Sequence, residues 1–467
     1  MAQARALLGT LKQRISAFIA LSILLLLMLR YQEKPPATLS SIVTTGPAQQ
    51  QQLSPTIDLS SPASPFIAFP LARVCAEASP AVPGLVFLCD NNSGGPGNIR
   101  NYILTCVRYA VEAGATALVM PRIRARSAVD LSNIHLGHRE FGYLFDEAHF
   151  RAALAAACPC LALWDRLEDV PHVLAKVERE GLYDVEKMVE RVTPRQQFGR
   201  RAGCDQRDLN RHTDRFGQRF RDWLEASAAE RGLAPLTHES PRLIRLNWGV
   251  LWDWEVLRDG PEFVGTFGSL LRFRADLIEL AGAVVAALRR EALAVSALQG
   301  GRNDSFLGVH LRTEEDALKE WPSFDMQAEG YMSEAIRQGY RGGLAYLASG
   351  SETESHKFKD RARSAAQIDV RTKFHLLQGL DLMKLKELTW DQQAVIDFIV
   401  LLAADYFVGV SPSSFSINVA LKRHLRTGGL YARPWKVGGS GDGLSHLVGA
   451  YTRYWDDWLF MYDGMWP

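Results

Sequence analysis

Apolar runs of the length of buried strands alternate with helical patterns along the second half of the chain. Three of these runs are Phe306–Val309, Gly343–Ala348 and Tyr406–Val410. Such alternation predicts an α/β fold with parallel strands, in which ligands bind outside the carboxyl ends of the strands. The runs end in the polar sequences HLRTEED, SGSE and SPSSFS, so we expect these three loops to meet in one crevice.

A β-α-β unit is also predicted at the start of the first half. Gly84–Cys89 and Ala115–Met120 have the composition of buried strands, with a helical pattern over Ile99–Ala113 between them. The connecting loop, Asp90–Asn98, is rich in glycine. Glycines let a backbone approach a ligand closely, and a helix start aims N–H groups at an anion. The loop is not the dinucleotide fingerprint, and an ordinary tight turn is the alternative interpretation.

The first seventy residues are expected to lie outside the folded part. Residues 15–29 (ISAFIALSILLLLML) carry no charge and would span about 22 Å as a helix, which is short for a bilayer core. We interpret residues 15–30 as a transmembrane signal anchor after a cytosolic tail of residues 1–14, and the polar residues 31–70 as a flexible stem. A cleaved signal peptide is the competing interpretation, but no small-x-small site follows the apolar run. The prediction is a single-pass type II protein of the Golgi or ER membrane, with its globular part in the lumen.

The globular part is long enough for two domains. The first covers residues 71–240 and includes a helical elaboration, and the second covers residues 241–467. Hydrophobic residues make up 47% of the sequence and charged residues 22%, as in globular proteins. The net charge of +1 gives no support for bulk nucleic-acid binding. An acidic substrate would therefore have to be bound by a few well-placed cations.

The six cysteines all precede residue 205, an arrangement that permits disulfides in an oxidising compartment but does not fix their pairing. The CPC sequence at residues 158–160 lacks the second ligand pair of a zinc site, and His135 and His138 have no third ligand nearby in sequence. We therefore expect no metal site. Acceptor sequons at Asn91 and Asn303 agree with a lumenal location without proving it.

His310 and Arg312 follow the predicted strand Phe306–Val309 directly. A permanently charged guanidinium two residues after an imidazole suits a phosphate or diphosphate at the end of a parallel strand. The alternative is an ordinary strand end, with Arg312 paired to Glu314 or Asp316 on the surface.

Four motifs occur in a characteristic order: GGxGN at the first turn between strand and helix, then HLR, then ASGxE, then GxxxSSFS. From roughly Gly84 to Arg423 the chain thereby resembles the GDP-fucose protein O-fucosyltransferase superfamily. The resemblance implies two facing Rossmann-like domains of the GT-B type, with the donor held mainly by the second. Gly95 and Pro96 stand where animal members have Arg-Phe, and SGSE stands where they have an Asp, which is closer to plant and fungal relatives.

The resemblance also implies roles for individual residues. Arg312 would bind the donor diphosphate and stabilise the departing GDP, and Asn98 would lie over the reacting sugar, so both are candidate catalytic residues. The other candidate residues for binding GDP-fucose are Gly95, Gly97, His310, Asp316, Gly350, Ser413, Ser414 and Phe415.

The chemistry of sugar transfer agrees with that assignment. Many sugar transferases hold a divalent metal with an Asp-x-Asp pair, and no such pair occurs in the sequence. We therefore expect no cofactor, and an inverting, metal-independent transfer of fucose to a hydroxyl of a protein or glycan acceptor. The general base stays open among Asp90, Glu314 and Glu315. The alternatives are a transferase of the same fold that uses another nucleotide sugar, and a catalytically silent, membrane-tethered carbohydrate-binding protein.

Overall fold

The computed structural model describes residues 57–78, 80–127, 130–199, 212–298, 300–314, 317–428 and 441–467. The predicted cytosolic tail, the predicted anchor and most of the predicted stem lie outside these residues. Within the described ranges, no helix combines the length and the apolar character needed to cross a membrane.

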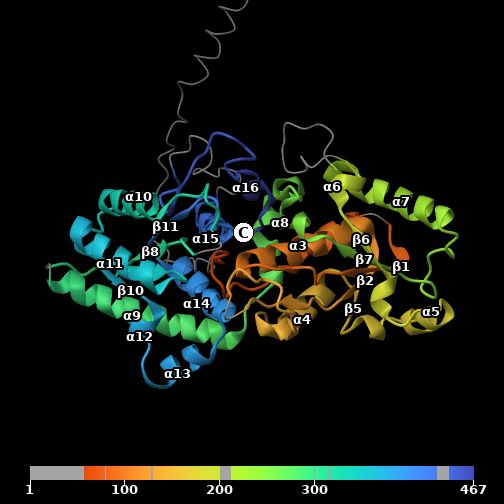
Figure 1. The fold of residues 1–467 in the computed structure, drawn as a ribbon, viewed down its shortest axis with the longest axis horizontal. Helices are drawn as coiled ribbons and strands as arrows, with labels where there is room; N and C mark the ends of the chain where they lie inside the picture. The colour runs from red at the N-terminus through yellow and green to blue at the C-terminus, as the bar shows by residue number, and fades with distance from the viewer. Residues whose placement is uncertain are drawn as a thin grey trace, which may run out of the picture. The chain divides into compact units, whose positions relative to one another are not determined.

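The first sheet has five parallel strands in the order β5-β2-β1-β7-β6 (Figure 1). Its strands are β1 (Val82–Leu88), β2 (Ala115–Val119), β5 (Ala162–Trp164), β6 (Val189–Val192) and β7 (Arg242–Leu246). The predicted β-α-β unit is present as β1, α3 (Pro96–Ala113) and β2. β7 pairs with β1 and β6, so the first sheet includes a strand that the sequence analysis assigned to the second domain, beyond the boundary at residue 240.

Two buried arginines explain why the sequence pattern did not reveal β7. Its sequence, RLIRL, places charge inside a fully buried strand. Arg242 forms an ion pair with Glu190 at 2.7 Å, and Arg245 pairs with Asp90 at 2.7 Å. Both partners are remote in sequence, so no local hydrophobic pattern could indicate a buried strand here.

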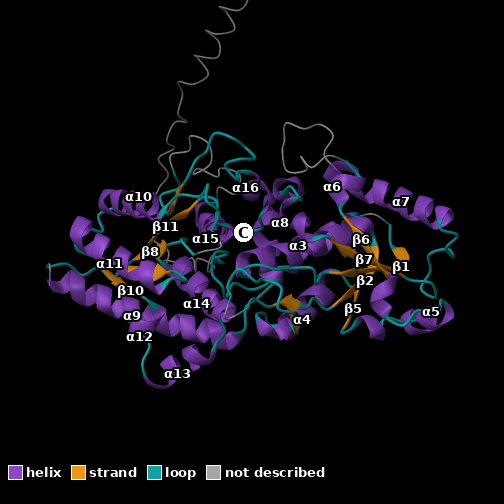
Figure 2. Ribbon diagram, viewed as in Figure 1, coloured by secondary structure: helices purple, strands orange, loops and turns teal. Residues whose placement is uncertain are grey.

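The second sheet also has five parallel strands, in the order β10-β9-β8-β11-β12. Figure 2 labels β8, β10 and β11 of this sheet. Its strands are β8 (Leu307–His310), β9 (Leu344–Ala348), β10 (Asp369–Arg371), β11 (Tyr406–Val410) and β12 (Ser445–Val448). β8, β9 and β11 are the three strands that the apolar runs predicted. Because they are neighbours and parallel, their carboxyl ends lie at one edge of the sheet. The predicted α/β class with parallel sheets is confirmed.

Helices separate most of the strands, and a short antiparallel pair, β3 (Ile123–Arg124) and β4 (His138–Arg139), follows β2. The described helices are α2 (Ala68–Glu77), α3, α4 (Glu147–Ala157), α5 (Val173–Arg179), α6 (Pro194–Gln197), α7 (Phe216–Glu230), α8 (Pro261–Phe267), α9 (Ala275–Leu298), α10 (Phe324–Arg337), α11 (Glu352–Ala366), α12 (Lys373–Leu376), α13 (Gly379–Glu387), α14 (Trp390–Ala403), α15 (Ser414–His424) and α16 (Phe460–Gly464).

The last residues of the chain join α3 of the first half to α15 of the second. Trp466 is fully buried, and its backbone carbonyl accepts hydrogen bonds from Arg100 of α3 at 2.8 Å and from Asn418 of α15 at 2.9 Å. The two helices also approach closely at their amino-terminal ends. A Cβ atom added to Gly97 would lie 3.4 Å from the carbonyl oxygen of Ser414. This packing sets the start of α3 against the start of α15.

Two disulfides stabilise the first half. Cys75 of α2 bonds to Cys158, at the end of α4, and Cys89 bonds to Cys106 of α3. Disulfides among these cysteines were compatible with the sequence, but the sequence alone could not assign their pairing. Cys160 is exposed and belongs to neither bridge, and Cys204 lies outside the described residues.

Candidate active site

A cavity of about 560 Å³ lies where the glycine-rich loop of the first half meets the carboxyl ends of β8, β9 and β11. The three polar loops therefore meet, as the sequence predicted. The candidate residues that line this cavity are Gly95, Asn98, His310, Arg312, Gly350, Ser413, Ser414 and Phe415. Gly97 lies beside it, against Ser414 and Phe415. Asp316 and Glu315 are outside the described residues.

Arg312 lies in the cavity wall with its side chain 18% exposed. Gln327 of α10 fixes the backbone of this residue from both sides: Arg312 N–H donates to Gln327 Oε1 at 3.0 Å, and Gln327 Nε2 donates to the Arg312 carbonyl at 2.9 Å. The guanidinium donates to Glu314 at 2.5 Å and lies 5.7 Å from the ring centre of Trp321. The cation is thus oriented before any ligand arrives.

Glu314 connects two strand ends. One carboxylate oxygen accepts the Arg312 hydrogen bond, and the other accepts the N–H of Gly350, after β9, at 2.6 Å. The side chain is only 9% exposed. The ion pair that the sequence offered as an alternative to ligand binding is therefore present, but it lies in the wall of the cavity. Both carboxylate oxygens of Glu314 hold the site together.

His310 ends β8 with its ring inside the cavity wall. Its Nδ1 lies 2.7 Å from Ser416 Oγ, and its ring centre lies 4.5 Å from that of Phe415. Ser416 Oγ also accepts the N–H of Val410 at 3.1 Å, which ties β8 to β11 and α15. Burial lowers the pKa of His310 to about 4, so the imidazole is neutral at physiological pH.

The pKa of His310 predicts an acid sensitivity of the fold. The ordinary histidine pKa is 6.5, so between pH 6.5 and about 4 the unfolded chain binds a proton that the folded chain does not. The free energy of unfolding should therefore fall as the pH falls through this window, by up to about 3 kcal/mol. A variant with His310→Asn keeps a polar group near Ser416 but cannot titrate. Denaturant unfolding at pH 7 and pH 4.5 measures the loss of unfolding free energy between the two pH values. This loss should be smaller for the variant than for the wild type, and equal losses would contradict the lowered pKa of His310.

The amino-terminal end of α15 forms the third part of the cavity. Ser413 caps the helix, with its Oγ accepting the N–H of Ser416 at 3.5 Å. The N–H groups of Ser414 and Phe415 precede the first hydrogen bonds of the helix, and the helix dipole adds partial positive charge there. This end of the cavity, like Arg312, is suited to an anion.

Several residues that line the cavity were not predicted from the sequence. Lys373 at the start of α12 forms an ion pair of 2.7 Å with Asp397 of α14, and Tyr346 also donates to Asp397 at 2.5 Å. Arg126 places its guanidinium 4.8 Å from the ring centre of Trp390. Each contact joins elements that are remote in sequence, and β10, which positions Lys373, was not predicted. No local signal could have identified them.

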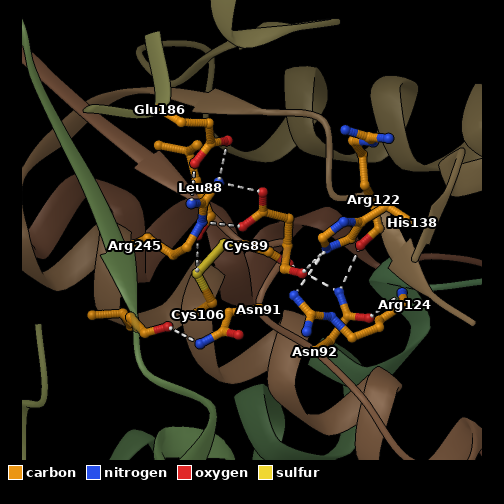
Figure 3. Close-up of polar contacts among 12 residues, drawn as sticks. Leu88, Cys89, Asn91, Asn92, Cys106, Arg122, Arg124, His138, Glu186 and Arg245 are labelled. Carbon is orange, nitrogen blue, oxygen red and sulfur yellow. Dashed lines mark hydrogen bonds and ion pairs between the residues drawn. A yellow bond between two sulfur atoms is a disulfide. The ribbon is translucent and has the colours of Figure 1, made fainter. Parts of the chain in front are cut away.

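Asp90, a candidate base, is placed elsewhere. Arg245 of β7 binds its carboxylate through two hydrogen bonds of 2.7 Å. The same Arg245 guanidinium contacts Glu186 at 2.6 Å, as Figure 3 shows. Asp90 lines a different cavity, of about 320 Å³, at the ends of β1 and β2. Its carboxylate stabilises the buried arginine of β7, and it is not among the residues that line the cavity around Arg312.

Comparison with known families agrees with the resemblance seen in the motifs. The family model described as GDP-fucose protein O-fucosyltransferase matches residues 85–426, which is most of the chain. The protein is therefore a glycosyltransferase. It belongs to the GDP-fucose protein O-fucosyltransferase family.

Solved structures of low identity were also found. One is a mutant of Arabidopsis thaliana FUT1 in complex with GDP, with 13% identity and a TM-score of 0.36, covering 76% of this chain and 71% of that chain. Another is the fucosyltransferase NodZ from Bradyrhizobium, with 17% identity and a TM-score of 0.36, covering 73% of this chain and 92% of that chain. No curated protein matched the sequence significantly. At these scores the structural likenesses carry no argument, and the family assignment rests on the family model.

Proposed function

We propose that this protein transfers fucose from GDP-fucose to a hydroxyl group, with inversion at the sugar and without a metal ion. The observation that carries the proposal is the convergence of Arg312 and the start of α15 on one cavity. They come from the adjacent parallel strands β8 and β11, so their spacing is set by the sheet. Together they supply a fixed cation and backbone N–H groups for a diphosphate.

The transfer requires charge stabilisation on the departing GDP. In the proposed reaction the acceptor oxygen attacks the anomeric carbon from the side opposite the diphosphate, and the bond from that carbon to the diphosphate breaks. The proton of the acceptor hydroxyl passes to a base. The negative charge that develops on the diphosphate is met by Arg312 and by the N–H groups of Ser414 and Phe415. Asn98, at the start of α3, lines the same cavity, and we assign to it the contact with the sugar. Among the described residues, no group of three or more His, Cys, Asp or Glu side chains lies close enough together to hold a metal ion.

Glu314 is assigned a positioning role because its oxygens already bind Arg312 and Gly350. Replacement by glutamine keeps an oxygen for the N–H of Gly350 but removes the ion pair. Replacement by alanine removes both contacts. We expect Glu314→Gln to retain measurable transfer, lowered by about tenfold, and Glu314→Ala to lose considerably more.

The pH dependence of kcat separates this role from that of a base. A base would give equal, near-complete losses in both Glu314 variants and would remove the acidic limb of the pH profile. A positioning residue leaves that limb in place in the glutamine variant. Equal losses with a flattened acidic limb would show that Glu314 takes the proton.

We further propose that the globular part works in the lumen of the Golgi or ER, behind a type II anchor at residues 15–30, and acts on a protein or glycan. Two disulfides support an oxidising compartment, because such bonds are rare in the cytosol. Of the two sequons, Asn303 is exposed, whereas the side chain of Asn91 is partly buried and donates to the Leu246 carbonyl at 3.2 Å. A glycan is therefore expected at Asn303 rather than at Asn91.

A thermal-shift comparison with GDP, UDP and CMP tests the donor. A nucleotide present at 100 times its Kd should stabilise the protein by about 2.7 kcal/mol. Stabilisation by GDP alone is the expected result. Stabilisation by UDP would favour a transferase that uses another nucleotide sugar, and no stabilisation by any nucleotide would favour a catalytically silent protein.

A further inference from the structure

A small second cavity, of about 30 Å³, lies beside Lys422 of α15. Its lining combines three cationic side chains with serine hydroxyls, drawn from the segment before α2, from α3, from the loop before α9 and from α15. The polar residues that line it are Ser61, Ser64, Arg100, Ser269, Arg272 and Lys422.

Lys422 is an unusual residue in this cavity because it is 7% exposed and lacks a close counter-ion. Within the part of the chain that the structure describes, its Nζ makes no hydrogen bond and no ion pair. Burial, together with the charge of Arg100, lowers the pKa of Lys422 to about 7. A buried ammonium without a partner is costly, so a group that pairs with it here would stabilise the fold.

Ser64 supplies a second unsatisfied group in the same cavity. Its Oγ is buried and has no hydrogen-bond partner in the described structure. Arg272 donates to the backbone carbonyl of Ser64 at 3.5 Å, which holds this residue over the cavity. Two donors, an ammonium and a hydroxyl, therefore line one cavity, and neither is hydrogen-bonded within the described structure.

The charges around Lys422 are mostly positive. Arg100 is 4% exposed and donates to the carbonyls of Trp466 and Pro467 at 2.8 and 2.6 Å, and Arg272 adds a further cation. The Asp58 carboxylate acts on the charge of Lys422, but it already accepts hydrogen bonds from the N–H and the hydroxyl of Ser60. The neighbourhood has more cations than carboxylates.

We propose that this cavity binds a small monovalent anion of halide size, held between Lys422 and Ser64. The volume suits one or two particles the size of water, which a halide matches and which a phosphate or sulfate exceeds. The anion would join Lys422 of α15 to Ser64, in the segment before α2, beside Arg100 of α3. α15 begins with Ser414 and α3 begins with Pro96 and Gly97, so the anion would stabilise the region in which these two helices pack.

The thermal midpoint of the full chain at constant ionic strength tests the site. Sodium chloride or bromide is compared with sodium gluconate at pH 6.5, since gluconate is too large to enter. The wild type should unfold about 2 °C higher in either halide. Lys422→Met should lose this difference and should be no less stable in gluconate than the wild type, because the unpaired charge is gone. Lys357→Met is the matched control: that lysine is 58% exposed on α11, and the full halide effect should persist.

A second variant and a direct measurement keep the test decisive if Lys422→Met does not fold. Ser64→Ala removes only a hydroxyl and should reduce the halide effect. A crystal soaked in bromide should show an anomalous peak between Lys422 Nζ and Ser64 Oγ. Equal midpoints of the wild type in chloride and gluconate, a full halide effect in Lys422→Met, or no bromide peak in the cavity would each overturn the proposal.

Discussion

Replacing Arg312 by alanine is expected to lower the kcat of fucose transfer by a factor of about 10²–10³ or more, with the fold intact. The guanidinium of Arg312 lies at the end of β8, beside the start of α15. In the proposed reaction, the negative charge of the departing diphosphate develops at this place. The loss of the guanidinium leaves the N–H groups of Ser414 and Phe415, at the start of α15, as the remaining donors that the proposed reaction assigns to that charge. The measurement is the initial rate of transfer, with the thermal midpoint as the check on folding.

Arg312→Lys is the informative companion variant. Lysine keeps the positive charge but not the planar two-pronged contact to a diphosphate, nor the geometry of the 2.5 Å ion pair with Glu314. We expect it to be nearly as poor as alanine. Near-normal turnover in the alanine variant would contradict the assignment of Arg312, and near-normal turnover in the lysine variant would show that charge alone suffices.

Arg423→Met is expected to cause the largest loss of stability, about 3–5 kcal/mol. Arg423 is fully buried in α15, and its guanidinium donates to five backbone carbonyls, those of Leu401, Leu402, Ala404, Asp405 and Leu444, and to Ser445 Oγ. Methionine fills much of the volume but removes all six hydrogen bonds. The Leu402 and Leu444 carbonyls keep other donors, Arg426 and the N–H of Phe407, whereas the other carbonyls lose their side-chain donor. Since the carbonyls lie at the end of α14 and before β11 and β12, the loss should loosen the elements that carry the start of α15.

Urea unfolding measures this effect, with Arg363→Ala as the control. Arg363 is 78% exposed and forms only a surface ion pair with Asp369, so its loss should change the free energy of unfolding by less than about 0.5 kcal/mol. An Arg423→Met protein as stable as the control would mean that the five carbonyls are satisfied in another way.

The strands that could be predicted from the sequence are buried strands made up mainly of apolar residues. β8, β9 and β11 contain few or no charged side chains, and their runs were identified within about one residue. β7 and β10 were not predicted, because RLIRL and DVR place arginine inside or at the edge of a sheet. Their charges are compensated by carboxylates more than fifty residues away, such as Glu190 for Arg242 and Glu291 for Arg371.

The residues of the candidate site also fall into those that could be predicted from the sequence and those that could not. His310, Arg312 and Ser414 could be predicted because each follows a recognisable strand, and parallel strands end at one edge. Asp90 could not be excluded as a base from sequence, since its partner Arg245 lies 155 residues further on. Lys373 and Trp390 could not be included, because the contacts that place them in the cavity depend on the packing of α12 and α14.

The release of the nucleoside diphosphate, GDP or UDP, from a panel of sugar nucleotides tests the proposed function most directly. The purified protein is incubated with GDP-fucose, GDP-mannose or UDP-glucose, each in the presence of EDTA or of a divalent cation. We predict release of GDP from GDP-fucose at equal rates with EDTA and with the cation, and loss of this release in Arg312→Ala. Release from another donor but not from GDP-fucose, or abolition by EDTA, would contradict a metal-independent fucosyltransferase built around Arg312.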